Sequence, residues 1–532
     1  MTTHLSYSVP EGRRKKRILR IPESQSLYVC PQSCARRQAI RALRNGEADC
    51  MAFLQLSQAD LVSGDYEGLV GEAVAQLLEA LPKPPRVIQV YVNCVDDFVG
   101  TDGETLVAGL REQFPDVRFS LSHINPIAVD VQADFVGKMH AGLYGLLEQP
   151  ARQDAGVSVF GSFEPLPAET ELHAALSAAG AGSVRHIAAC DTFAEYQQLA
   201  ASAVALSVAR GGEQTARDVA QRFGMNFLSW RPTYSIAEVN ARYRELAAAL
   251  AGSEAMRGST AFCDGETTDE QALGRGVVAD CKPVEGAAAS SPVDGDSIAV
   301  TEGAFAFDEA GRALWKAMAP VLSPARARAQ AAVERALAAV GDTPVIVGAD
   351  ASFAPFDLAR ELAEYGFKVQ RVYGLHLKGA DQQAEARLRE AFPQVQVVRD
   401  ENVDAVLQSG VADGARSLGI GADAAFLAGT QWTVDIYHDE GYFGFQGIER
   451  LMNGIADAMA DAAAENVRVT GSCDTSEGVG RARMNPSASR DAAKGRMRNG
   501  EAIVVPAAVC RGLLRCGGRA VRAGQPQRHR RR

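Results

Sequence analysis

Short runs of apolar and β-branched residues alternate with stretches of helical periodicity along most of the chain. In the first block the pattern predicts strands at 27–30, 51–54, 86–93 and 117–120. Helices are predicted between these strands, at 35–43, 66–81, 104–113 and 131–147. This alternation is typical of βαβ units, which build parallel sheets.

The same rhythm recurs in two further blocks. The second has predicted strands at 157–160, 184–188, 203–207 and 227–230 and ends in a helix at 236–250. The third opens with a helix at 304–340, for which we predict a break at Pro320 and Pro324. It continues with strands at 344–348, 368–373, 395–398 and 424–427 and a closing helix at 447–463. The fold class is therefore α/β, with three Rossmann-like parallel-sheet layers and clefts between them.

Two segments lack any hydrophobic period and are predicted to be disordered, an insertion and a basic tail. We accordingly divide the chain into six parts. These are a basic N-terminal arm (1–24), three α/β domains (25–150, 151–250 and 304–465, the last with its leading helix), the low-complexity insertion (251–303) and the tail (466–532). No G-x-G-x-x-G motif opens any of the blocks, so a dinucleotide cofactor is not indicated.

Charge is distributed unevenly along the chain. The tail carries 15 Lys or Arg against 4 Asp or Glu, a balance of +11, so the total of −10 leaves −21 for the rest. An acidic body argues against nucleic acid as the main partner, although the tail alone could bind RNA or an acidic surface. No apolar stretch reaches the ~20 residues of a membrane span, and no secretory signal follows the basic start. We expect a cytoplasmic protein without a membrane partner.

Four of the ten cysteines fall in the first hundred residues: Cys30, Cys34, Cys50 and Cys94. In the predicted sheet they lie at the ends of strands or beside them, where thiols from different βα turns can converge. Thiolates are ligands of iron–sulfur clusters and of zinc, and zinc sites more often show paired C-x₂₋₄-C knuckles. The alternative is that each cysteine is a small buried hydrophobic residue.

Three motifs in this region carry a family resemblance. They are CPQSCARR around Cys34, Cys50 ahead of LSQADLVSGDYEGL, and CVDDFVGTD at 94–102, which is the most specific. In these motifs the chain resembles the nitrogenase component 1 proteins and their relatives, the protochlorophyllide and nickel-tetrapyrrole reductases. The similarity continues through RFGMNFLSW and GYFGFQGIERL and covers residues 27–463 apart from the insertion.

The resemblance implies an oxidoreductase subunit with an iron–sulfur cluster, of the 4Fe-4S type, held by Cys34, Cys50 and Cys94. The fourth ligand would come from Cys30 or from a neighbouring subunit. It further implies that a nitrogenase reductase-like iron protein, driven by ATP, supplies electrons for a substrate bound between the layers. The subunit would form a homodimer or a heteromer with a related chain.

Departures from the family pattern limit what the resemblance implies. Where the catalytic nitrogenase subunit has a cysteine and a histidine that hold the large cofactor, this chain has Val208 and Val434. Dinitrogen reduction is therefore not expected, and His438 is predicted to be a turn or surface residue. Two alternatives stay open: a scaffold or carrier for metallocofactor assembly without redox turnover, and a metal-free binding protein.

Overall fold

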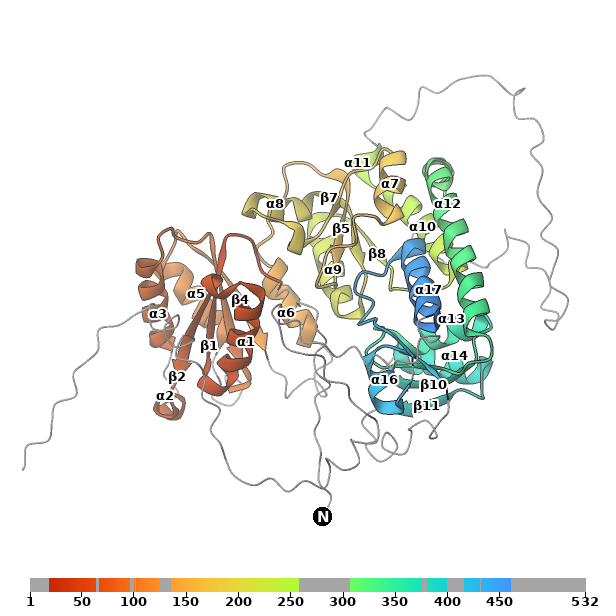
Figure 1. The fold of residues 1–532 in the computed structure, drawn as a ribbon. Helices are drawn as coiled ribbons and strands as arrows, with labels where there is room; N and C mark the ends of the chain where they lie inside the picture. The colour runs from red at the N-terminus through yellow and green to blue at the C-terminus, as the bar shows by residue number, and fades with distance from the viewer. Residues whose placement is uncertain are drawn as a thin grey trace, which may run out of the picture.

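The computed structural model describes residues 19–63, 67–95, 100, 102–124, 135–257, 307–374, 380–399, 416–430 and 432–460. In these residues the chain forms three parallel sheets with flanking helices (Figure 1). The predicted three-layer α/β fold is confirmed. Most of the predicted insertion, all of the tail and positions 1–18 of the arm lie outside the described residues.

Layer A (described residues 19–124) contains a four-stranded sheet in the order β2-β1-β3-β4. Its strands are β1 Ser24–Pro31, β2 Met51–Leu56, β3 Val87–Asn93 and β4 Arg118–Ile124. Its helices are α1 Gln32–Asn45, α2 Gln58–Ser63, α3 Glu67–Ala80 and α5 Gly103–Gln113, and a 3₁₀ turn, Ala48–Cys50, precedes β2. One face packs Leu27, Val29 and Val90 in an apolar core with α3 and α5. The opposite face carries stacked rings of Phe53, Tyr28 and Tyr91.

Layer B (described residues 154–257) has the strand order β6-β5-β7-β8. Its strands are β5 Asp154–Phe160, β6 Val184–Arg185, β7 Ser202–Ser207 and β8 Asn226–Ser229. Its α-helices are α7 Glu171–Ala178, α8 Phe193–Gln197, α9 Arg210–Phe223, α10 Ile236–Ala251 and α11 Glu254–Arg257. Helix α6, Phe135–Tyr144, contacts β4 of layer A and α9 of layer B. The strand predicted at 184–188 is shorter than expected, because the chain turns into a 3₁₀ segment at Ile187–Ala189.

Layer C (described residues 307–460) has a five-stranded sheet in the order β11-β10-β9-β12-β13. Its strands are β9 Val345–Val347, β10 Val369–Gly374, β11 Gln396–Arg399, β12 Leu418–Ile420 and β13 Trp432–Val434. Its helices are α12 Glu309–Val340, α13 Pro355–Glu364, α14 Ala380–Ala391, α16 Ala422–Ala428 and α17 Gly444–Ala460.

The strand predicted at 424–427 is wrong, because these residues lie in α16. The segment is rich in alanine, which favours a helix. The Asp350 carboxylate accepts hydrogen bonds from the backbone N–H groups of Ala422 and Asp423, and Gly429 ends the helix in the left-handed conformation. Short strands lie on either side of α16, and both were missed.

The predicted break at Pro320 and Pro324 is also wrong, since α12 continues through both residues. Both prolines are exposed, so the carbonyl groups that lose a hydrogen-bond partner can be hydrated. The opposite side of α12 packs against α10 of layer B and α17 of layer C, and α17 runs beside it in Figure 1. Layers B and C consequently share one continuous apolar core.

Candidate functional site

Three of the four candidate cysteines lie at the carboxyl end of the sheet in layer A. Cys30 is the last residue but one of β1, Cys34 lies in the first turn of α1, and Cys94 directly follows β3. Strands β1 and β3 are parallel neighbours, so their carboxyl ends meet at one edge. We call the positions of Cys30, Cys34 and Cys94 the thiol edge.

The three thiols differ in exposure. Cys34 is exposed and Cys94 is partly exposed, whereas Cys30 is 4% exposed and packs with Tyr28, Ala35 and Tyr91. Two of the thiols can therefore meet a ligand at the surface, and the third faces the interior of the layer.

Cys50 lies at the other end of the same sheet. It directly precedes β2, whose first residue, Met51, pairs with Ser26 near the start of β1, while Cys30 pairs with Gln55. Five residues of strand therefore separate the levels of Cys50 and Cys30, which is roughly 16 Å along the strand. The structure does not bring Cys50 to the thiol edge.

Two described residues of the CVDDFVGTD motif, Gly100 and Asp102, lie just before α5. Gly100 has a φ of 74°, a left-handed conformation that suits glycine. The Asp102 carboxylate caps α5, accepting hydrogen bonds from the backbone of Glu104 and Thr105 and from the Thr105 hydroxyl. These bonds hold the pKa of Asp102 below its usual value. The glycine and the last aspartate of the motif thus have structural roles.

The chemistry of the donors decides which group could fit the thiol edge. Among the described side chains, no three Cys, His, Asp or Glu residues are grouped so as to hold a single metal ion. An iron–sulfur cluster is larger than one ion, and a cluster normally takes four thiolates. Cys34 is exposed in the first turn of α1, after β1, and Cys94 is partly exposed just after the neighbouring β3, so the two thiols fit a cluster approached from one side.

A second candidate site is a crevice between layers B and C. Every segment that lines it follows the carboxyl end of a strand: 162–167 follows β5, 208–209 follows β7, Pro232 follows β8, Phe353 follows β9 and 438–443 follows β13. The carboxyl ends of parallel strands are where ligands bind in α/β sheets. Its cavity volume is about 30 Å³, so a ligand larger than a few water molecules would have to part the layers.

One wall of the crevice is a turn with two unusual backbone conformations. His438 and Asp439 have φ values of 48° and 57°, which non-glycine residues rarely adopt. The buried Asp439 carboxylate accepts hydrogen bonds from the Tyr234 hydroxyl of layer B and from the Ser352 hydroxyl and Phe353 N–H of layer C. Burial raises the pKa of Asp439 to about 6. Strain held by surrounding contacts is a feature of functional sites.

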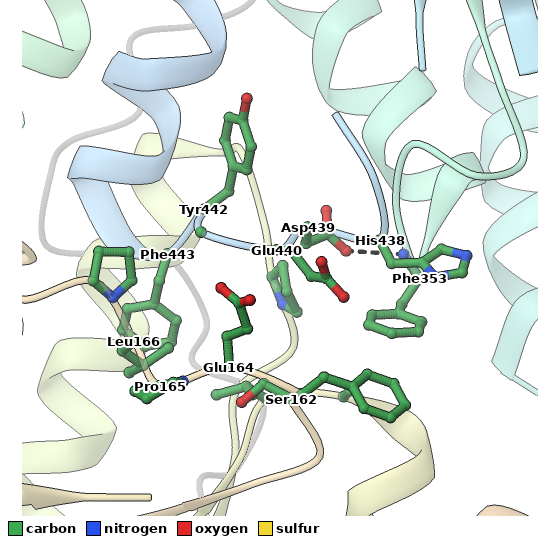
Figure 2. A pocket seen from close by; sticks show the side chains of 16 residues that line it. Ser162, Glu164, Pro165, Leu166, Phe353, His438, Asp439, Glu440, Tyr442 and Phe443 are labelled. Carbon is green, nitrogen blue, oxygen red and sulfur yellow. Dashed lines mark hydrogen bonds between the residues drawn. The ribbon is translucent and has the colours of Figure 1, made fainter. Parts of the chain in front are cut away.

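Carboxylates and aromatic rings surround the crevice in Figure 2. Glu164 rises from layer B toward the 438–443 turn, which carries Glu440. The His438 ring stacks on Phe353 with centroids 4.8 Å apart. His438 thus lies in a turn, partly buried, and lines the crevice.

The two valines noted in the sequence are close to this crevice. Val208 lines it and is 5% exposed, and Val434 ends β13, four residues before His438, and is 4% exposed. Both positions therefore present buried aliphatic side chains and no metal ligand.

The comparisons with known proteins agree with this architecture. Residues 18–272 match the family model described as nitrogenase component 1 type oxidoreductase. The match covers just under half of the chain and supports the nitrogenase component 1 family for that part. Its members bind iron–sulfur clusters. A search of curated proteins finds no match.

Two solved structures resemble the chain in fold. The structure titled "Nitrogenase Cp1 at pH 6.5" has a TM-score of 0.57 and 14% identity, covering 87% of this chain and 93% of that one. The structure titled "Nitrogenase Cp1 at pH 5" has a TM-score of 0.51 and 11% identity, covering 83% and 86%. At these identities the likeness shows a shared fold. None of the described helices is long and apolar enough to cross a membrane.

Proposed function

We propose that this chain is the substrate-reducing component of a nitrogenase-like oxidoreductase. It would bind an iron–sulfur cluster, of the 4Fe-4S type, at the thiol edge and reduce a substrate other than dinitrogen in the crevice between layers B and C. The observation that carries the proposal is that Cys34 and Cys94 directly follow the neighbouring parallel strands β1 and β3, in a part of the chain that matches this family's model.

Within the proposal, Cys34 and Cys94 are the primary ligands. Cys30 lies on the same edge and could complete the set after a change of rotamer, and a neighbouring subunit could supply the remaining ligand. Cys50, a ligand in the sequence-based set, would need the 3₁₀ turn before β2 to rearrange. When bound, the cluster supplies one-electron transfer, and the protein adjusts its potential through burial and hydrogen bonds.

The proposed partners are an ATP-dependent iron-protein reductase and a second subunit, either another copy or a related chain. The exposed apolar side chains of layer A support a partner surface near the thiols. Ile40 and Leu43 on α1 are 41% and 54% exposed, and Val62 on α2 is 88% exposed. Helix α1 also carries Cys34, so a partner that covers these residues would reach the thiol edge.

A substrate other than dinitrogen follows from the crevice. Val208 and Val434 offer no ligand for a large metal cofactor, and the crevice holds carboxylates and aromatic rings in its place. A scaffold that carries a metallocofactor precursor without reducing anything is the alternative with the same fold. Turnover with a strong reductant separates the two, because a scaffold transfers its cargo unchanged.

Anaerobic purification followed by iron and sulfide analysis tests the proposal. We expect matched iron and sulfide in the wild type and a clear loss of both in Cys34→Ala and Cys94→Ala. Cys190→Ala is the matched control, since Cys190 is a partly buried cysteine of layer B and should leave the metal content unchanged. A wild type without iron, or equal loss in all variants, would contradict the proposal.

Two further variants settle the ligand set. Loss of iron in Cys30→Ala would identify Cys30 as the remaining cluster ligand. Full retention of iron would assign that ligand to a neighbouring subunit. Loss in Cys50→Ala keeps Cys50 among the ligands, and retention confines the site to the thiol edge.

A further inference from the structure

The segment from Ser162 to Pro167 is the most exposed wall of the crevice between layers B and C. It supplies six of the lining residues and lies between β5 and α7. None of the residues 162–169 is buried. On the facing walls, Val208, Tyr442 and Phe443 are only 5%, 7% and 3% exposed. The crevice is therefore covered on one side by a segment that itself has little cover.

Hydrogen bonds hold this segment only near its ends. At its start, His186 Nε2 lies 3.1 Å from the carbonyl oxygen of Ser162 and 3.2 Å from its hydroxyl. The other ring nitrogen of His186 accepts a backbone N–H, so Nε2 carries the hydrogen and is the donor. Farther along, residues 163–168 form one hydrogen bond to a described residue outside this range, from the Thr170 N–H to the Pro167 carbonyl oxygen. The middle of the segment is thus held by packing alone.

Two side chains provide that packing. Phe163 packs against the apolar cluster that layers A and B share, and Leu166 packs against the core of layers B and C. Both side chains are only partly buried. Pro165 and Pro167 have no N–H group and a fixed φ, so they stiffen the segment and give it no further backbone donors. Segments with few buried contacts and a solvent-exposed backbone open locally at a small cost in free energy.

The other walls are tied to the body of the fold. The Val208 N–H donates to the Phe160 carbonyl oxygen at 3.0 Å, and the His438 N–H donates to the Asp350 carbonyl oxygen at 2.7 Å. The buried Asp439 carboxylate accepts hydrogen bonds from both layers. Parting the layers as a whole would break these bonds and open the shared core. The exposed segment can move with the loss of two partly buried side chains.

From these contacts we infer that residues 163–168 form a lid, which moves away from the 438–443 turn and opens the crevice while layers B and C stay packed. Figure 2 shows Glu164 of this lid pointing toward that turn across the crevice. Ser162 and Thr170 are the fixed points on either side of the lid. The inference rests on the proposed function, because the lid would admit the substrate to the same crevice. A cavity of about 30 Å³ requires such an opening for any ligand larger than a few water molecules.

Thiol labelling beneath the lid tests the inference. Val208 lines the crevice, whereas Val204 of the preceding strand β7 is 0% exposed and does not line it. The full chain carrying Val208→Cys or Val204→Cys is treated with iodoacetamide, and peptide mass spectrometry separates the new thiol from the native cysteines. We expect the thiol of Val208→Cys to react at least about tenfold faster, at a rate that low urea does not change, because local opening exposes little surface. Equal rates would overturn the inference, since only global unfolding would then expose either thiol.

Variants of the lid locate the opening. Leu166→Ala removes one anchor and should speed labelling of the Val208→Cys thiol at least about fivefold. Leu337→Ala is the matched control, because Leu337 of α12 is also partly buried against the same core and does not line the crevice. Tyr234→Phe loosens the contact between layers B and C and serves as a second control. An unchanged rate in Leu166→Ala, or an equal increase in either control, overturns the inference.

Two further measurements separate the lid from other effects. The labelling rate of Val204→Cys should stay the same when Leu166→Ala is added, which shows that global unfolding is not the cause. Iron and sulfide content, measured on the same samples, is a separate readout, so the cluster proposal can stand if the lid does not open.

Discussion

Layer A and the pair formed by layers B and C place their polar groups in different ways. Layer A has an apolar core of its own and a smaller cluster, with Ile21 and Val87, that it shares with layer B. Its candidate ligands lie at an edge where Cys34 is exposed and Cys94 is partly exposed. Layers B and C share one core, and buried carboxylates join them across the interface. Glu171 of layer B binds the start of α17, Glu361 of layer C binds the 233–234 segment, and Asp439 binds Tyr234.

The difference indicates a division of roles. Buried carboxylates with several donors fix the turns that line the crevice, because each donor would be unsatisfied without them. At the thiol edge the Asn93 amide bonds the Val29 carbonyl oxygen and the Val95 N–H, and exposed apolar side chains lie near it. Residues of layers B and C line the crevice, whereas Cys34 and the apolar side chains near the thiol edge are exposed.

Removing Asp439 should have the largest effect on stability. Asp439→Ala leaves the Tyr234 and Ser352 hydroxyls and the Phe353 N–H without their acceptor. We expect a loss of about 3–5 kcal/mol in the free energy of unfolding, measured by urea denaturation. Tyr234→Phe removes one of the three bonds and should cost about 1–2 kcal/mol. A loss below about 1 kcal/mol in Asp439→Ala would show that this carboxylate does not hold the layers together.

Glu171 should come next. Its carboxylate accepts hydrogen bonds from the backbone N–H groups of Phe445 and Gln446 at the start of α17 and from the Tyr243 hydroxyl. Glu171→Ala is expected to destabilise the protein by about 2–4 kcal/mol. Hydrogen exchange should show faster exchange of the first turn of α17 with little change in layer A. Equal acceleration in layer A would contradict the separation of the two regions.

The third prediction concerns pH. Burial and the nearby Glu238 raise the pKa of Glu361 to about 8. A carboxyl group with a raised pKa stabilises the fold below its unfolded pKa, and that stability is lost as the pH rises through the folded value. Unfolding of the B–C unit should therefore become easier between about pH 4.5 and pH 8, by up to about 1.4 kcal/mol per pH unit from this group.

Glu361→Gln tests whether the Glu361 carboxyl group causes this loss of stability as the pH rises. The variant keeps a carbonyl oxygen to accept a hydrogen bond and cannot ionise, so its melting temperature should fall less steeply with pH than that of the wild type. Glu364→Gln on the same helix is the control, since Glu364 is exposed and bonded to Arg360. Parallel pH profiles for wild type and Glu361→Gln would show that Glu361 is ionised throughout this range.

The smallest effect is expected in layer A. Asp102→Ala removes the cap of α5 and should cost about 1 kcal/mol, whereas Asp102→Asn keeps an acceptor and should cost less. Local hydrogen exchange in α5 measures both. If Asp102→Ala instead abolished iron binding without destabilising α5, Asp102 would act on the cluster and the purely structural role assigned to it would be wrong.

The alternation of apolar runs was sufficient to predict the three sheets, since most strands coincide with buried β-branched runs such as Val87–Asn93. It failed where tertiary contacts decide the structure. The alanine-rich segment of α16 is helical because Asp350 caps it, and β12 and β13 have only three residues each, too few for a period. The prolines of α12 show the same limit, because the helix continues through Pro320 and Pro324 only where both face the solvent.

The candidate sites were predictable in part. Cysteines near strand ends were visible in the sequence, but Cys50 precedes its strand and Cys94 follows one, and parallel strands place those positions at opposite edges. Clefts between the layers were predicted, but the residues that line this crevice were not, because they come from five separate segments. One sequence signal could have pointed to the crevice: a polar turn, His438 to Gly441, directly follows an apolar run.

The most direct test of the central claim is low-temperature EPR of the anaerobically purified, reduced full chain, comparing wild type with Cys94→Ala. The account predicts an iron–sulfur signal in the wild type that disappears in Cys94→Ala and persists in Cys190→Ala. Identical signals in the wild type and Cys94→Ala, or a wild type without any signal, would contradict it.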